Sequence, residues 1–160
     1  MSNLIIRDAK VEDSQAILDF ITDLAIYENA KEEVKTNVEQ IKESIFGDNS
    51  TVKALICEEN NIPIGFAVYF YNYSTWLGKN GICLEDLYVS EEKRGKGVGK
   101  AILKHLVKKA YDEGCGRVEW SCLDWNTPSR EFYESIGAVS QDEWIGYRLE
   151  GDAIVDFINS

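Results

Sequence analysis

Two groups of residues in the middle of the chain have the types and spacing that chemistry requires. The first is a pair of adjacent carboxylates, Glu85 and Asp86, in an apolar run. The second is a basic, glycine-rich stretch that begins at Arg94 and reads Arg94-Gly95-Lys96-Gly97-Val98-Gly99. A glycine turn that leads into a helix offers unpaired backbone N–H groups and the positive end of the helix dipole. The sequence therefore predicts a phosphate site next to two carboxylates.

Two common phosphate motifs do not fit the glycine stretch. A Walker loop needs a longer spacer than the one between Gly95 and Gly99, and Ala101 stands where the Mg²⁺-binding hydroxyl belongs. A dinucleotide fingerprint reads Gly-x-Gly-x-x-Gly early in a βαβ unit, whereas this stretch reads Gly-x-Gly-x-Gly and lies deep in the chain. Both motifs are excluded.

Hydrophobic periodicity predicts the elements that hold these residues in place. The predicted order is strand, helix, helix, three strands, helix, strand, helix, strand. A meander followed by βαβ crossovers favours an α/β (α+β) fold with a mixed sheet of about six to seven strands and helices on both faces. The length suits a single domain over residues 1–160. Strands are expected at 4–7, 52–58, 64–71, 81–89, 117–123 and 144–149, and helices at 13–27, 36–46, 97–113 and 129–135, with a short closing element at 153–158.

The overall charge limits the partners. The chain has 17 basic and 28 acidic residues, a net charge of −11, which argues against nucleic acid or an anionic membrane and is compatible with a cationic partner or with solubility alone. No apolar run reaches the ~20 residues of a membrane span, and residues 1–7 lack a basic leader, so we expect a cytoplasmic protein. One histidine and no Cys-x-x-Cys pair predict no metal site.

The glycine stretch resembles the acetyl-CoA pyrophosphate loop of the GCN5-related N-acetyltransferase (GNAT) superfamily, whose pattern is Gln/Arg-x-x-Gly-x-Gly/Ala. A downstream segment, Asn126-x-x-Ser129-x-x-Phe132-Tyr133, resembles the second cofactor-binding region of the same superfamily. The chain is most similar to the spermidine/spermine (diamine) and thialysine acetyltransferases. The stretches that carry this resemblance are 24–28, 84–89, 94–99, 125–129 and 132–133.

The resemblance implies a GNAT fold and acetyl-CoA as co-substrate. Backbone groups at Leu87, Tyr88 and Val89 would contact the acetyl carbonyl and the pantetheine arm. A solvated charge cluster is the alternative for the basic stretch, although such a cluster would not need the glycines. The remaining residues implied to bind the cofactor are Arg94, Gly95, Lys96, Gly97, Val98, Gly99, Lys100, Asn126, Ser129 and Phe132.

Amine acetylation needs a neutral amine, yet an alkylamine with a pKa of about 10.4 is almost fully protonated at pH 7. By resemblance, Glu85 binds the amine and removes its proton, directly or through water, and Asp86 binds substrate. On a regular strand the two side chains point to opposite faces. Tyr133 matches the general acid that protonates the thiolate. The alternative for Glu85 and Asp86 is that they are solvated carboxylates at the edge of the sheet. The alternative for Tyr133 is that it is an ordinary aromatic residue of the core.

The acceptor is expected to be a small cationic amine. Tyr27, Glu28 and Trp76 could form an aromatic and acidic wall for such a cation. One departure from polyamine enzymes concerns the acidic residue before the Gly-Trp-Arg of the last strand. This chain has Ile145 there, with Asp142 and Glu143 upstream.

We therefore expect an acetyl-CoA-dependent N-acetyltransferase for a diamine or polyamine, acting by direct transfer in a ternary complex. The first alternative is an acetyltransferase for an amino acid, a thialysine-like compound or a protein amine. The second is a sensor with the GNAT fold that binds acyl-CoA without turnover. The resemblance also implies a homodimer.

Overall fold

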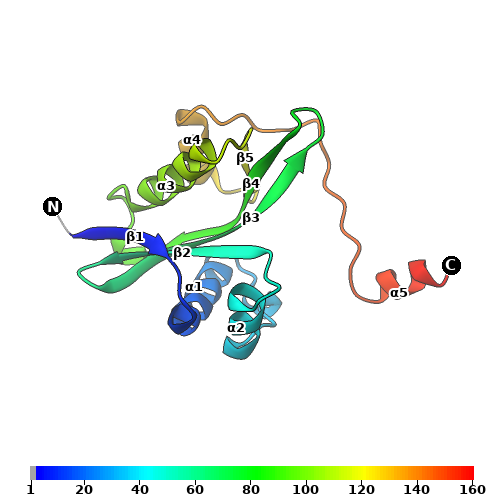
Figure 1. Ribbon diagram of the computed structural model, residues 1–160, viewed down its shortest axis with the longest axis horizontal. Helices are drawn as coiled ribbons and strands as arrows, with labels where there is room; N and C mark the ends of the chain where they lie inside the picture. The colour runs from blue at the N-terminus through cyan, green and yellow to red at the C-terminus, as the bar shows by residue number, and fades with distance from the viewer. Residues whose placement is uncertain (1–2) are drawn as a thin grey trace. The chain divides into compact units, whose positions relative to one another are not determined.

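A computed structural model of the protein describes residues 3–160 (Figure 1). Residues 1 and 2, which begin the segment expected to lack a leader, lie outside the described residues. The chain divides into two compact units, one that ends at Ser121 and one that runs from Cys122 to Ser160. Each unit is described by itself below.

The first unit is built on one sheet of five strands, which lie in the order β1-β2-β3-β4-β5. The pairs β1–β2, β2–β3 and β3–β4 are antiparallel, and the pair β4–β5 is parallel, so the predicted mixed sheet is confirmed. The strands are β1 (Leu4–Asp8), β2 (Val52–Glu59), β3 (Ile62–Ser74), β4 (Lys79–Val89) and β5 (Val118–Trp120).

Helices cover both faces of this sheet, as the sequence predicts. Figure 1 shows α1 (Ser14–Tyr27) and α2 (Val38–Phe46) on one face and α3 (Val98–Asp112) on the other. On the α1 side, Ile17 and Phe20 pack with Ile41 of α2 against Phe66 and Tyr88 of the sheet. On the other face, α3 buries an apolar stripe of Val98, Ile102, Leu103, Leu106 and Ala110. These two layers fix the ends of α1 and β4 relative to each other.

Three short 3-10 turns complete this unit: η1 (Val11–Asp13), η2 (Lys31–Glu33) and η3 (Glu91–Lys93).

Two connections are shorter than expected because the strands run further into polar sequence. The β2–β3 hairpin turns on Asn60 and Asn61, which adopt the left-handed φ values of 52° and 68° that asparagine tolerates. The polar loop expected at 72–80 reduces to a turn between Ser74 and Lys79, because the flanking residues pair as the ends of β3 and β4. Polar residues are tolerated there because Lys79 and Asn80 are exposed, and the hydroxyl of buried Ser74 accepts a hydrogen bond from the backbone N–H of Leu77.

The second unit contains α4 (Thr127–Ser135) and α5 (Asp152–Ile158). The strand expected at 144–149 is not formed in the described residues, so the sheet has five strands rather than six to seven. The large apolar side chains of this segment are exposed, as Tyr147 at 94% illustrates. A strand needs a neighbouring strand to satisfy its backbone, and alternating apolar residues alone do not supply one. None of the described helices has the length and apolar character needed to cross a membrane.

Candidate active site

The candidate site begins with a pocket of about 620 Å³ between the end of α1, the connection to α2 and the middle of β4. This volume suits a small-molecule ligand. Four carboxylates line the pocket, namely Glu28, Glu33, Glu85 and Asp86. The structure thus brings together three of the predicted acceptor residues. The other residues of the lining are Ile21, Ala25, Ala30, Val34, Lys35, Thr36 and Gln40.

A β-bulge explains why Glu85 and Asp86 share this pocket. Strand β3 pairs Tyr69 with Leu84 and the preceding Val68 with Asp86, so Glu85 is the extra residue on β4. A bulge breaks the alternation of side chains between the two faces of a sheet. The expectation that the two carboxylates point to opposite faces is therefore wrong, because both line the same pocket.

The two neighbouring carboxylates differ in their surroundings. Glu85 is exposed, whereas Asp86 is half-buried. Burial, followed by the negative charges of Glu85 and Glu28, raises the pKa of Asp86 to about 6. Burial also raises the pKa of Glu28, which caps the end of α1. A bound cation would relieve the repulsion between these groups, so the charges of the pocket favour a cationic ligand over an anionic one.

The glycine stretch forms an open turn at the start of α3. Gly95 and Gly97 have left-handed φ values of 76° and 81°, where a side chain would strain the backbone. Gly97 is the N-cap of α3 and provides no side-chain cap. Within residues 3–160, the backbone N–H groups of Val98, Gly99 and Lys100 have no hydrogen-bond partner. Such a helix N-terminus fits a pyrophosphate group.

The side chain of Arg94 attaches this turn to the ends of α1 and β4. Its guanidinium carbon lies 5.1 Å from the centre of the Tyr27 ring and 5.0 Å from that of Tyr88. Its Nε donates a hydrogen bond of 3.0 Å to the carbonyl oxygen of Val89. Arg94 therefore joins the end of α1, the end of β4 and the glycine turn through its side chain. Cation–π contacts of this kind contribute about 0.5–2 kcal/mol each.

Three lysines near the turn differ in whether they form an ion pair. Lys93 forms an ion pair with Glu59 of β2. Lys96 and Lys100 form no ion pair with any residue of the described chain, and both flank the free N–H groups. Their charges remain available for an anion at the turn.

Strand β4 has a free backbone edge between the pocket and the turn. Pairing with β5 covers only Ile82–Leu84, so within residues 3–160 no strand pairs with 87–89 on that side. The opposite edge is paired with β3 through Leu87↔Ala67, Tyr88↔Phe66 and Val89↔Gly65. Unpaired N–H and C=O groups on an edge are available to an extended, amide-containing ligand. The free edge and the open turn together fit the pantetheine and pyrophosphate parts of acetyl-CoA.

The second unit carries the other residues predicted to contact the cofactor. Asn126 is the N-cap of α4, and its side-chain oxygen accepts a 3.4 Å hydrogen bond from the backbone N–H of Ser129. Phe132 and Tyr133 lie on α4 with ring centres 5.6 Å apart. Their roles stay predictions.

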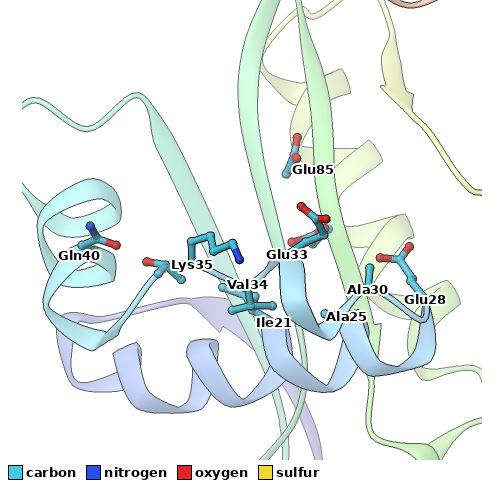
Figure 2. Close-up of a pocket in the computed structure, with 11 residues that line it drawn as sticks. Ile21, Ala25, Glu28, Ala30, Glu33, Val34, Lys35, Gln40 and Glu85 are labelled. Atoms are coloured by element: carbon cyan, nitrogen blue, oxygen red, sulfur yellow. The ribbon is translucent and has the colours of Figure 1, made fainter. Parts of the chain in front are cut away.

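Two residues predicted to line the acceptor site lie outside the pocket lining. Tyr27 contacts Arg94, as described above, and Trp76 is 85% exposed in the turn between β3 and β4. Conversely, sequence reasoning missed Glu33, Lys35 and Gln40, which line the pocket (Figure 2). The only signal for Glu33 and Lys35 is their position just after the end of a helix predicted to carry acceptor residues, and Gln40 lies in the first turn of α2. Within residues 3–160, no group of three His, Cys, Asp or Glu side chains is placed to hold a metal ion.

Comparison with known proteins agrees with this arrangement. Residues 17–138 match the model of the acetyltransferase (GNAT) family. The chain is 36% identical to the thialysine N-epsilon-acetyltransferase of Sus scrofa, with 96% of each chain covered. It is 32% identical to the human spermidine/spermine N(1)-acetyltransferase-like protein 1, with 94% of this chain and 23% of that protein covered.

Solved structures show the same fold. An integron cassette protein from the mobile metagenome of V. cholerae superimposes with a TM-score of 0.83 and 25% identity, with 98% of each chain covered. An aminoglycoside N-acetyltransferase in complex with CoA gives a TM-score of 0.72 at 18% identity, with 92% of this chain and 95% of that chain covered. The chain therefore belongs to the GNAT family of acetyltransferases.

Proposed function

We propose that this acetyltransferase moves the acetyl group of acetyl-CoA to a primary amine of a small cationic acceptor, by direct transfer in a ternary complex. The observation that carries the proposal is the position of the acidic pocket. Its carboxylates Glu85 and Asp86 lie on β4, immediately before the free backbone edge and the open glycine turn. Acceptor and donor sites are therefore adjacent along one segment of the chain.

The donor side relies on backbone groups. The N–H groups at the start of α3, with Lys96 and Lys100 beside them, would hold the pyrophosphate of acetyl-CoA. The free edge at 87–89 would hold the pantetheine amides and orient the thioester. GNAT acetyltransferases use acetyl-CoA, which when bound supplies an acetyl group activated as a thioester.

The acceptor side relies on carboxylates. Asp86 and Glu28 would hold the ammonium form of the acceptor. Exposed Glu85 would take a proton from it, directly or through water, and so leave a nucleophilic amine. The amine nitrogen forms a bond to the acetyl carbon as the carbon–sulfur bond breaks, and the nitrogen then loses its extra proton to solvent to give the neutral amide. Tyr133 would donate its proton to the leaving sulfur and recover one from solvent.

The relatives' names favour this acceptor class without choosing within it. One relative is named for thialysine and another for spermidine and spermine, and all three compounds carry primary amines. A diamine or polyamine and the side-chain amine of an amino acid are therefore both acceptors that the pocket charges favour. A sensor that binds acyl-CoA without turnover does not need the acidic pocket.

Steady-state release of CoA thiol by Glu85→Gln tests this proposal. We expect kcat to fall by about a hundredfold, because a positioned base typically contributes that much or more. Glu39→Gln is the matched control, because Glu39 is exposed on α2 and lies outside the pocket lining. Equal turnover of the wild type and Glu85→Gln across several amines would contradict the assignment of this pocket.

A further inference from the structure

We propose that Lys35 is a specificity-determining residue, which binds a carboxylate on the acceptor and so selects a diamino acid over the corresponding diamine. The inference rests on the proposed function, since it concerns the acceptor of that same site. Lys35 has a positive charge, whereas the other charged residues of the pocket lining are negative. Among the lining residues, all within the described chain, Lys35 is the single cation beside four carboxylates.

The backbone presents Lys35 and Glu33 to the same side. Glu33 ends the turn η2, and Val34 is extended, with φ −75° and ψ 107°. Residues two apart on an extended backbone point to one face. Both side chains accordingly line the pocket. The segment thus offers one cation and one anion, which is the charge pattern that complements the zwitterionic end of an amino acid.

Lys35 is available for this contact. Although four carboxylates line the same pocket, Lys35 forms no ion pair with any residue in the part of the chain that the structure describes. Figure 2 shows its side chain reaching from the connection before α2 toward the middle of the pocket, with Glu28 on the far side and Glu85 apart from both. The ammonium group of Lys35 therefore enters the pocket from the side of this connection, opposite Glu28.

Because these groups are separated, different residues would bind the two ends of the acceptor. Glu85 and Asp86 on β4 would hold the reacting amine, while Lys35 and Glu33 would hold an α-carboxylate and an α-ammonium group. A diamine places only positive charge in the pocket, so it meets repulsion from Lys35 and gains nothing from it. A diamino acid carries the carboxylate that converts this repulsion into a charge-assisted hydrogen bond.

Matched acceptor pairs test the proposal. Ornithine and putrescine differ only in the α-carboxylate, and so do lysine and cadaverine. We would measure kcat/KM of the wild type for each member and take the ratio within each pair. Lys35→Met keeps the length of the side chain without its charge, and Lys35→Arg keeps the charge. Lys31→Met is the control, because Lys31 is exposed in η2 and lies outside the pocket lining.

We expect Lys35→Met to lower the ratio of diamino acid to diamine by about tenfold, mainly through KM, because one charged hydrogen bond is lost. Lys35→Arg should retain most of the preference, and Lys31→Met should retain all of it. General damage to the fold would affect both members of a pair alike and leave the ratio unchanged. A ratio unchanged by Lys35→Met overturns this inference alone. Absence of turnover with every amine overturns the proposed function, and this inference with it.

Discussion

At the scale of single residues, burial of Asp86 lowers the free energy of unfolding while it prepares the pocket to bind a cation. Its folded-state pKa of about 6 lies above its ordinary value of 3.8. Between these values the folded protein binds more protons than the unfolded chain, so folding becomes less favourable as pH rises from about 4 to 6. The cost persists at neutral pH, where Asp86 is ionised in both states. A half-buried carboxylate with a raised pKa is typical of a functional site that binds a cation.

Asp86→Asn should therefore be more stable than the wild type at pH 8, by up to about 3 kcal/mol for a shift of this size. The difference should vanish near pH 3, below the ordinary pKa of 3.8, where Asp86 is mostly protonated in both states. Urea denaturation at the two pH values measures it. Equal unfolding free energies of the two proteins at pH 8 would mean that Asp86 is not strained by its burial.

The same residue predicts a pH dependence of activity. Wild-type kcat/KM for a cationic acceptor should fall as pH drops through about 6, because protonated Asp86 no longer attracts the ammonium group. Asp86→Asn should raise KM at pH 8 and lose this limb of the profile. Profiles of identical shape for the two proteins would assign the limb to another group.

Tyr133 is the second residue whose role is open to a direct measurement. Tyr133→Phe should lower kcat by about a hundredfold or more, because the general acid is lost while the ring is kept. CoA affinity, measured by calorimetry, should change little. Tyr111→Phe removes the hydroxyl of a tyrosine that is 82% exposed on α3 and serves as the control. Unchanged turnover in Tyr133→Phe would exclude Tyr133 as the acid.

At the scale of elements, the site depends on the junction of β4 and α3. The bulge at Glu85 directs two carboxylates into one pocket, and the turn after Val89 exposes the first N–H groups of α3. Arg94 contacts Tyr27 and the end of β4 and so links the acceptor and donor sides. The bulge and the turn depend on backbone geometry, whereas the link between the two sides depends on the side chain of Arg94.

Gly97→Ala tests the backbone of the glycine turn. No atom lies within 4 Å of a Cβ placed there, so the expected cost of about 1–2 kcal/mol comes from the left-handed φ of 81°. Urea denaturation should register this loss, and the affinity for CoA should fall because the turn shifts. Gly99→Ala is the control, since its Cβ would lie at an ordinary 3.7 Å from Leu87 and Val89 side chains and its φ is not left-handed. Equal stability of the two variants would contradict this account of the turn.

The sequence predicts the elements better than their junctions. The apolar stripes of α1, α2 and α3 have a clear helical period, and all three helices form where expected. The bulge at Glu85 has no signature in the sequence, because it arises from the register between β3 and β4. Glu33 and Lys35 were missed because the connection between α1 and α2 has no periodicity. The strand expected at 144–149 was wrong. Alternating apolar residues indicate a preference for extended backbone, but they do not show that a partner strand is present.

At the scale of the whole molecule, the expected homodimer stays a prediction, and the segment 144–149 is the surface at which it can be tested. Trp144, Ile145, Tyr147 and Leu149 are 65%, 75%, 94% and 55% exposed. Apolar side chains gathered on so short a segment are typical of an interaction surface. A second copy of this chain is the partner that the family resemblance favours.

Light scattering after size-exclusion chromatography measures the assembly. The wild type should elute with the mass of two chains, and Trp144→Ser combined with Tyr147→Ser should shift it toward one. Val139→Ser, at an exposed apolar residue outside the segment, is the control. A monomeric wild type at concentrations near 1 mg/mL, roughly those of ordinary chromatography, would contradict the homodimer.

The most direct test of the whole account is turnover by the wild-type protein. Thiol release from acetyl-CoA would be followed with a panel of diamines, polyamines and amino acids, and the acetylated product identified by mass spectrometry. We expect release of CoA that requires a primary amine, matched one for one by N-acetylated acceptor, and strongest with acceptors that carry at least one further cationic group. Tight binding of CoA without acetylation of any amine in the panel would contradict the account.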